Sequence, residues 1–316
     1  EVAFVFTGPA GAYSGMGRDL ALALPELVDR CAARFRRLRE VAGWIYDEAP
    51  AYRATPIQKL WGSSYLIQLH AELTRGLLGV RPDAAIGYCS GETNALFALG
   101  AWQDLDGFER AIHASRIYSH ELAGELRCVR QAWRAPEGEA VGWTAVRVLA
   151  PAPAVRAALE QESRAHLTIV NGPADVVVAG DPAACARVAS RVGAPRVRTI
   201  DYDFVMHCPE ARVFAAEWRA LHHRPTTPVP GVRFYTHATC ASYEPTSDAV
   251  AEALTGQAMS VVDFPRLVER AWADGVRVFV EHGPHAGCTK WIGETLGDRE
   301  HLAVSLDAYG RSSSLQ

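Results

Sequence analysis

The sequence lacks the features that mark several large classes of protein. Its basic residues are scattered and the formal net charge is −4, so we expect no nucleic-acid partner. No apolar run approaches the roughly 18 residues that a membrane-spanning helix needs, and no signal peptide precedes the first apolar stretch. These absences predict a cytoplasmic protein without a membrane partner.

The seven cysteines form no C-x-x-C pair and are odd in number. Neither a disulfide framework nor a metal site is therefore expected. Cys31, Cys128 and Cys185 lie on apolar faces, where a free cysteine is usually a small buried side chain. The chain opens with Glu1 directly before an apolar stretch, which suggests a piece of a longer polypeptide.

The apolar pattern predicts an α/β fold built around a parallel sheet. A strand at 2–6 is followed by a glycine loop and a helix over 16–39, and a second helix over 57–78 precedes the strand that ends before Cys89. Strands that alternate with helices at this spacing favour a parallel sheet. Later elements are a helix at 209–222, a strand at 231–237, two helices across 247–275, a strand at 276–283 and a helix from about 285.

The pattern changes between residues 137 and 201. Here the order is strand, helix, strand, strand, helix, strand, which predicts an inserted ferredoxin-like subdomain. Residues 1–136 and 202–310 would then form the larger core, and 311–316 a disordered tail.

Cys89 stands at a distinctive turn. It follows a strand, has Gly87 and Gly91 at −2 and +2, and precedes a helix. α/β-Hydrolase-like enzymes hold their nucleophile in this setting, usually as serine, and the helix N-terminus would lower a thiol pKa and bind an oxyanion. The alternative is a small buried cysteine of no catalytic role.

His207 is the best candidate for a base. It lies in the apolar segment "FVMHCP" at the return from the insert, where a cleft between the two subdomains is expected. Its alternative is a structural histidine. The other candidates are less promising: His222, His223, His285 and His301 lie in polar text and are expected at the surface, and His70, His113 and His120 fall within helices.

Five segments together resemble acyl-CoA:acyl-carrier-protein transacylases, in particular the acyltransferase domains of iterative polyketide and polyunsaturated-fatty-acid synthases. They are "FVFTGPAGAYSGMG" (4–17), "GVRPDAAIGYCSGE" (79–92), "NGPADVVVAGD" (171–181), "HCPE" (207–210) and "VEHGPHAGCT" (280–289). The resemblance covers nearly the whole chain. It implies an α/β-hydrolase-like large subdomain with an inserted ferredoxin-like small subdomain and a catalytic dyad between them.

By this resemblance Cys89 takes the place of the nucleophilic serine and His207 that of the base. A thiolate attacks thioesters readily, and cysteine here is also similar to starter-unit transacylases of fungal aromatic polyketide synthases. A backbone carbonyl from 281–284 would orient the imidazole, and Asn171 would steady the site or the pantetheine arm. The resemblance implies no bound cofactor, acyl-CoA or acyl-phosphopantetheine as substrate, and an acyl carrier protein and neighbouring synthase domains as partners.

Where the family carries an arginine that clamps malonyl carboxylates, the chain has Ala114. Arg116 would point away on a helix, and Arg110, one turn back, is a weak substitute. Losing a bidentate partner costs a buried carboxylate several kcal/mol. A neutral acyl group is therefore expected instead of malonyl.

The predicted oxyanion hole also departs from the family. Its donors would be the N–H groups of Ser90 and of the residue at position 9, but Pro9 has no N–H. Ala10 could supply the donor after a shift of the loop. One missing donor costs about 10²–10³ in rate.

Apolar side chains replace polar ones at other expected pocket positions. Tyr88 takes the place of the family's histidine in the elbow, and an apolar residue replaces a glutamine near residue 60. The pocket is predicted to include Trp61, Tyr88, Ala114, Asn171, Phe204 and Met206. Each of the apolar ones could equally be an ordinary core residue.

The favoured prediction is acyl transfer from a CoA or carrier thioester, through a Cys89 acyl-enzyme, to an acyl carrier protein of a polyketide or fatty-acid megasynthase. One alternative is a degenerate, non-catalytic docking domain, which Pro9 and Ala114 favour. Another is an editing hydrolase that uses the same dyad.

Overall fold

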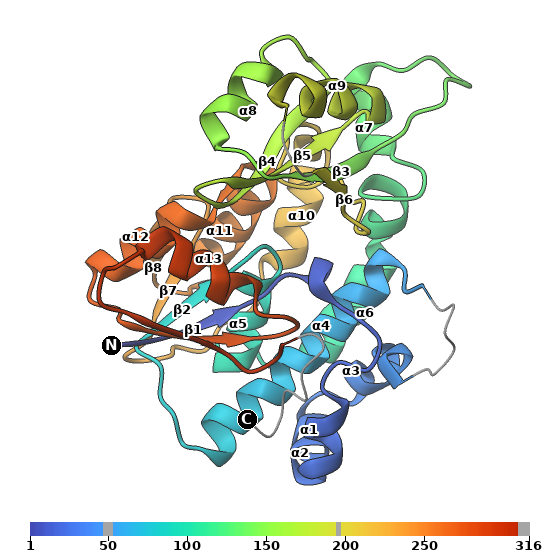
Figure 1. Ribbon diagram of the computed structural model, residues 1–316. Coiled ribbons are helices and arrows are strands. Elements are labelled where there is room, and N and C mark those ends of the chain that lie inside the picture. The colour runs from blue at the N-terminus through green and yellow to red at the C-terminus, as the bar shows by residue number, and fades with distance from the viewer. Residues whose placement is uncertain (47–52, 194–196, 309–316) are drawn as a thin grey trace.

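A six-stranded sheet forms the centre of the computed structural model (Figure 1), which describes residues 1–46, 53–193 and 197–308. The strand order is β11-β10-β1-β2-β7-β8, and every neighbouring pair is parallel except β7 and β8. The strands are β1 Val2–Phe6, β2 Ala84–Gly87, β7 Arg233–Thr236, β8 Ala241–Tyr243, β10 Val278–His282 and β11 Leu302–Ser305. The predicted tail at 311–316 lies outside the described residues.

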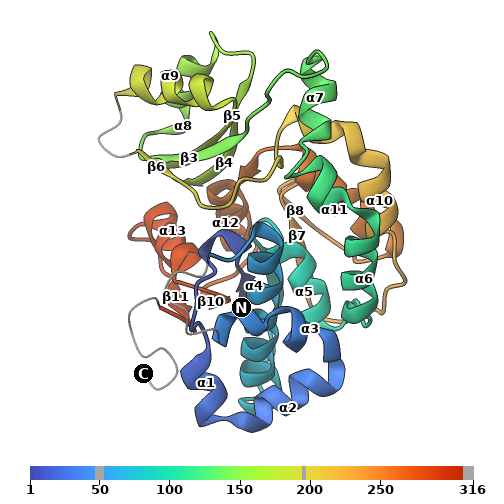
Figure 2. The same ribbon diagram turned by 90° about the vertical axis from the view of Figure 1, so that its right-hand side faces the viewer.

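The helices surround this sheet and extend to a second, smaller layer (Figure 2). They are α1 Arg18–Ala23, α2 Pro25–Arg34, α3 Arg36–Val41, α4 Pro56–Ala71, α5 Gly91–Leu99, α6 Leu105–Ser115, α7 Arg127–Trp133, α8 Ala152–Leu159, α9 Pro182–Val192, α10 Ala215–His222, α11 Ser247–Met259, α12 Phe264–Ala273 and α13 Gly287–Leu296. In the described part of the chain, none of the helices has the length and apolar character needed to cross a membrane.

The central strand β1 is buried on both faces. Phe4 and Phe6 join a core with α4 and α5, whereas Ala3 and Val5 pack with α12 and α13. Successive side chains of a strand point to opposite faces. The continuous apolar text of β1 is therefore what a strand between two helical layers requires.

A five-stranded sheet forms the smaller layer, with α8 and α9 packed against it (Figure 1). Its order is β6-β3-β5-β4-β9. The strands are β3 Thr144–Val148, β4 Ala165–Gly172, β5 Asp175–Gly180, β6 Val197–Thr199 and β9 Val262–Asp263. The fold is thus the predicted one, a parallel α/β part with a smaller mixed α/β part. The edge strand β9, which lies between α11 and α12 in the chain, pairs with β4, extends the small sheet and joins the two parts.

The helix predicted over 16–39 is in fact three helices. The breaks fall at Leu24 and Phe35, whose backbone φ and ψ angles lie outside the helical region. Pro25 explains the first break, because a proline disfavours helical geometry in the residue before it. The helix predicted over 57–78 ends as α4 and continues as the π-helical turn Glu72–Leu77, and the one predicted at 209–222 begins as the 3-10 turn Pro209–Phe214.

Candidate active site

The turn between β2 and α5 holds Cys89 in a strained backbone conformation. Its φ is 55°, in the left-handed region that non-glycine residues seldom occupy. A Cβ on Gly87 would lie 2.1 Å from the Glu92 nitrogen, and one on Gly91 would lie 1.9 Å from the Phe6 carbonyl oxygen. Gly87 therefore allows β2 to approach the start of α5, and Gly91 allows α5 to approach β1, so that Cys89 is presented above the sheet.

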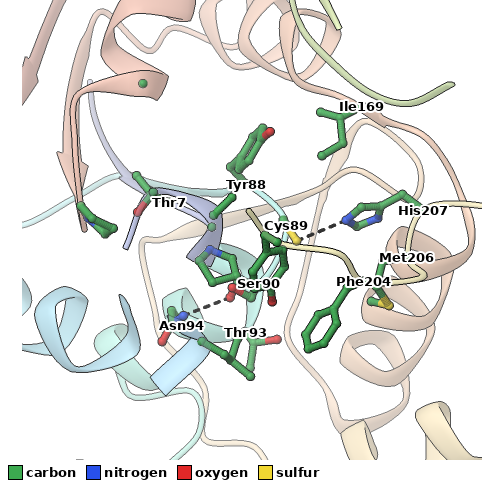
Figure 3. A pocket seen from close by; sticks show the side chains of 18 of the residues that line it. Thr7, Tyr88, Cys89, Ser90, Thr93, Asn94, Ile169, Phe204, Met206 and His207 are labelled. Atoms are coloured by element: carbon green, nitrogen blue, oxygen red, sulfur yellow. Dashed lines mark hydrogen bonds between the residues drawn. The ribbon is translucent and has the colours of Figure 1, made fainter. Parts of the chain in front are cut away.

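His207 faces this thiol. Its Nε2 lies 3.2 Å from Cys89 Sγ (Figure 3). The ring Nδ1–H of His207 donates to the carbonyl oxygen of Gln257 at 2.9 Å, and its backbone N–H donates to the Ala258 carbonyl oxygen at 2.7 Å. Because the carbonyl at Gln257 can only accept, Nδ1 carries the proton and Nε2 presents a lone pair to the thiol.

The orienting carbonyl therefore comes from α11, and the prediction that it comes from 281–284 is wrong. That segment is engaged elsewhere. The His282 carbonyl accepts from the Thr7 N–H at 3.1 Å, and the Glu281 carboxylate accepts from the N–H groups of Cys288 and Thr289 at the start of α13.

Both members of the pair are neutral near pH 7. Burial raises the pKa of Cys89 to about 12, although its contact with the Ser90 backbone acts to lower it. Burial lowers the pKa of His207 to about 4. The expected lowering of the thiol pKa by the helix is thus overridden, and a base must remove the thiol proton during attack.

The candidate oxyanion donors border the same cavity. Pro9 begins the 3-10 turn Pro9–Gly11, and Ala10 is its second residue. The first N–H groups of such a turn have no partner within it. Ser90 precedes α5, and its position also borders the cavity. The site therefore has Ser90 and Ala10 as backbone N–H candidates, with proline between Gly8 and Ala10.

One end of the cavity, which measures about 620 Å³, is polar. We call this end the polar arm; its bordering residues include Tyr88, Arg147, Asn171, Lys290 and Trp291. The Tyr88 hydroxyl donates to Asn171 Oδ1 at 2.7 Å. Asn171 Nδ2, Trp291 Nε1 and the Arg147 guanidinium all donate to the buried carboxylate of Asp175. This network ties the small sheet to the Cys89 turn and to α13.

The other end is apolar. We call it the apolar arm; its bordering residues include Trp61, Phe97, Phe108, Tyr118, Trp218, His222 and Leu254. They come from α4, α5, α6, α10, α11 and the segment after α6. Figure 2 shows α10, which carries Trp218 and His222, and α13, which carries Lys290 and Trp291, on opposite sides of α4 and α5. Among the described residues, Arg147 and Lys290 are the Lys and Arg side chains that border the cavity, and both belong to the polar arm.

Residues 3–308 match the model of a family described as "Acyl transferase domain". The chain belongs to this family. It is 28% identical over 253 residues to a polyunsaturated fatty acid synthase protein of Thraustochytrium sp., covering 74% of this chain and 12% of the relative. It is 30% identical over 301 residues to polyketide synthase GfsA of Streptomyces halstedii, covering 90% of this chain and 4% of the relative.

A solved structure supports the same assignment. The acyltransferase domain from the second module of the salinomycin polyketide synthase superposes with a TM-score of 0.76 at 25% identity, covering 99% of this chain and 70% of that one. The chain spans only a small part of the length of its two synthase relatives. It is thus an acyl transferase domain with the two-part fold of this family.

Most of the residues predicted for the pocket of this acyl transferase domain border the cavity. Trp61, Tyr88, Asn171, Phe204 and Met206 do so, and Figure 3 shows Phe204 and Met206 on the His207 side of the thiol. Their roles in substrate binding remain predictions.

Ala114 does not border the cavity, which corrects its place in the predicted pocket. It is exposed on α6, as are Arg110 and, just past the helix, Arg116. The buried face of α6 is formed by Leu105, Phe108 and Ile112. At about 100° per residue Ala114 falls on the outer face of α6, so its predicted place in the pocket is wrong.

His222 is the second correction among the candidate residues. It was expected at the surface but is 1% exposed and borders the apolar arm. The burial of Cys31, Cys128 and Cys185 is confirmed. In the described part of the chain, no cluster of three or more His, Cys, Asp or Glu side chains could hold a metal ion.

Nothing in the sequence pattern pointed to Gln257. It contributes only a backbone carbonyl to the dyad, and every residue type has one. Arg147 and Trp291 were also missed as parts of the polar arm. An arginine and a tryptophan near the pocket segments are common features, so no local signal distinguished them.

Proposed function

We propose that this domain transfers a neutral acyl group from a thioester donor to the phosphopantetheine thiol of an acyl carrier protein, through a Cys89 thioester. The observation that carries the proposal is the Cys89–His207 pair, 3.2 Å apart, between a polar and an apolar arm. The pair supplies a nucleophile and a base, and the two arms supply separate places for carrier and acyl group.

In the first half-reaction, Cys89 Sγ attacks the thioester carbonyl as its proton passes to His207 Nε2. The oxyanion would accept hydrogen bonds from the N–H groups of Ser90 and Ala10. The intermediate then collapses, the carbon–sulfur bond to the donor breaks, and the leaving thiolate takes the proton from His207. The carrier thiol repeats these steps in reverse and restores the Cys89 thiol.

The charge distribution favours a donor that lies along the polar arm. Arg147 and Lys290 would face the phosphate groups of CoA or phosphopantetheine there. The apolar arm offers no Lys or Arg among the described residues that border it. A malonyl carboxylate would be desolvated there without a partner, so it would be disfavoured.

The partners would be an acyl carrier protein and the neighbouring domains of a synthase. The two similar synthases, of which the chain spans 12% and 4%, support this context.

The test is intact-protein mass after brief incubation with a panel of acyl-CoA donors, from malonyl to medium-chain and aromatic. We expect one acyl group on the protein, absent in Cys89→Ala and formed at least 100-fold more slowly in His207→Ala. Cys240→Ala is the matched control, because Cys240 is also half-buried with a left-handed φ of 52° but lies outside the cavity.

The same experiment separates the alternatives. Addition of a phosphopantetheinylated carrier should move the acyl group to the carrier. Release of free acid without transfer would support an editing hydrolase. No adduct with any donor would support a docking module, and faster labelling by malonyl-CoA than by neutral donors would overturn the selectivity.

A further inference from the structure

His222 is a buried polar side chain in the wall of the apolar arm. It ends α10, is 1% exposed and borders the apolar arm. Its ring lies 4.5 Å from the ring of Trp218, 5.4 Å from Phe108 and 6.2 Å from Trp102, measured between centroids. Aromatic packing therefore fixes the imidazole where a substrate could meet it.

The hydrogen bond that this imidazole makes determines which ring nitrogen remains available to a ligand. Nδ1 lies 2.7 Å from the carbonyl oxygen of Trp218, which can only accept, so Nδ1 carries the proton. Burial lowers the pKa of His222 to about 4, so the ring is neutral near pH 7. Nε2 is then a lone-pair acceptor, and it makes no hydrogen bond with any residue that the structure describes.

A series of ring contacts connects this acceptor with the dyad. Phe204, which lies beside His207 in Figure 3, packs 5.3 Å from Tyr118. Tyr118 packs 6.0 Å from Trp218, which contacts His222. His222 thus lies three ring contacts beyond Phe204. An acyl chain bound at Cys89 would have to be extended, or carry a ring, to reach it.

We propose that the apolar arm receives an extended acyl group whose far end carries a hydroxyl, and that this hydroxyl donates to His222 Nε2. The inference rests on the proposed function and names the class of acyl group. A hydroxyl matches because it is neutral and can donate. A carboxylate would find no Lys or Arg among the described residues of this arm, and an ammonium group would lose its hydration without a carboxylate in return.

A second buried polar group near His222 also lacks a hydrogen-bond partner among the described residues, but it does not pair with His222 Nε2. The indole N–H of Trp102 is buried without an acceptor in the described part of the chain. Its ring does not border the cavity, and its N–H makes no hydrogen bond to the imidazole. The imidazole is therefore a polar group of this arm that a substrate can reach, as is the Tyr118 hydroxyl nearer the dyad.

The test compares matched donors that differ only in the hydroxyl. Hexanoyl-, octanoyl-, decanoyl- and dodecanoyl-CoA are each paired with the ω-hydroxy form, and phenylpropanoyl-CoA with its para-hydroxy form. Intact-protein mass gives kcat/KM for acylation of Cys89. We expect at least one hydroxylated donor to react about tenfold faster than its partner, the value of one buried hydrogen bond.

The ratio should depend on the imidazole. In His222→Phe and His222→Leu, which remove the acceptor, the ratio for that pair should fall to one or below. In Leu254→Met, which changes the same arm without changing hydrogen bonding, it should persist. Each ratio is measured within one protein preparation, so a partial loss of folded protein does not alter it.

Two results would overturn the inference. One is a ratio below about two for every pair in the unsubstituted domain, which needs no variant to fold. The other is a high ratio that survives in both His222 variants. In either case the domain still forms acyl adducts. Failure of the proposed function is different, because no donor of any kind would then label Cys89.

Discussion

The two arms of the cavity are held in place by different physical means. The polar arm is set by hydrogen bonds that converge on Asp175, a carboxylate that is 3% exposed. The apolar arm is set by contacts between rings, such as those of Trp218 with Tyr118 and His222. The dyad lies where the two meet, at the junction of the small sheet with the large one.

This difference separates two tasks that one substrate imposes. On the proposed function, the carrier portion of the thioester would be constant, and fixed hydrogen bonds suit a constant ligand. The acyl group would be the part that is selected, and a packed apolar chamber can be resized by exchanging one side chain. Changes in the polar arm should therefore affect all donors alike, whereas changes in the apolar arm should alter the choice among them.

Removal of the carboxylate at the centre of the polar arm should have the largest effect. Asp175→Ala leaves three donors without their acceptor, one of them the Arg147 guanidinium. We expect the free energy of unfolding to fall by about 3 kcal/mol, and KM to rise by a similar factor for every acyl-CoA. Urea unfolding and acylation kinetics measure the two effects.

The control is an arginine–carboxylate pair at the surface. Glu125 accepts from Arg127 with its side chain 52% exposed, and Glu125→Ala should lower the free energy of unfolding far less than Asp175→Ala does, because solvent screens the pair. If Asp175→Ala proves equally mild, or changes the ranking of donors, the two arms do not have the separate roles assigned here.

Trimming the apolar arm should have a smaller effect on stability but should change selectivity. Trp218→Phe removes a ring and the hydrogen bond from its indole N–H to the Leu254 carbonyl, 3.2 Å away. We expect a loss of about 1–2 kcal/mol and a preference for longer acyl chains. Acylation rates across a chain-length series check this.

Trp272→Phe is the matched control for that change. Its indole N–H also donates to a backbone carbonyl, that of Glu300 at 3.1 Å, but at the surface. The chain-length preference should not move in this variant. An unchanged preference in Trp218→Phe as well would mean that the acyl group does not enter the apolar arm.

The parts of the fold and site that depend on local pattern could be predicted from the sequence. The turn at Cys89 was found because Gly87 and Gly91 flank the thiol at −2 and +2 in the sequence, between an apolar strand and a helix. The small sheet was found because its strands and helices alternate visibly. Strands β9 and β11 were missed, since they are short and acquire their role only by pairing with β4 and β10.

The parts that depend on tertiary packing could not be predicted. His222 lies in the polar text "LHHRP", and only the contact of α10 with α11 and α6 turns it inward. His223, its neighbour, is exposed. The carbonyl of Gln257 reaches His207 because α11 ends beside that loop. A residue that acts through its backbone has no side-chain signature in the sequence.

A smaller perturbation of the polar arm is the loss of one hydroxyl. Tyr88→Phe removes the hydrogen bond to Asn171 and keeps the ring against Phe264 and Trp291. We expect the free energy of unfolding to fall by about 1 kcal/mol and KM to rise severalfold for all donors. In Tyr235→Phe, which loses a hydroxyl contact with Asp274, neither residue bordering the cavity, only the stability should change.

The smallest expected effect is that of pH on acylation of the unsubstituted domain. His207, with its pKa lowered to about 4, accepts a proton only in acid, and Cys89, with its pKa raised to about 12, ionises only in strong base. The neutral thiol–imidazole pair therefore predominates from about pH 5 to about pH 9. If it is the reactive form, the single-turnover rate should vary less than about twofold over that range.

The pH profile of His207→Ala tests whether the imidazole makes the single-turnover acylation rate insensitive to pH. Without a base, attack would depend on the small fraction of thiolate present. Because the thiol pKa lies far above the range, that fraction rises about tenfold per pH unit, and the rate should rise with it. A sloping profile in the unsubstituted domain would instead mean that the thiol ionises before attack, and that His207 does not serve as its base.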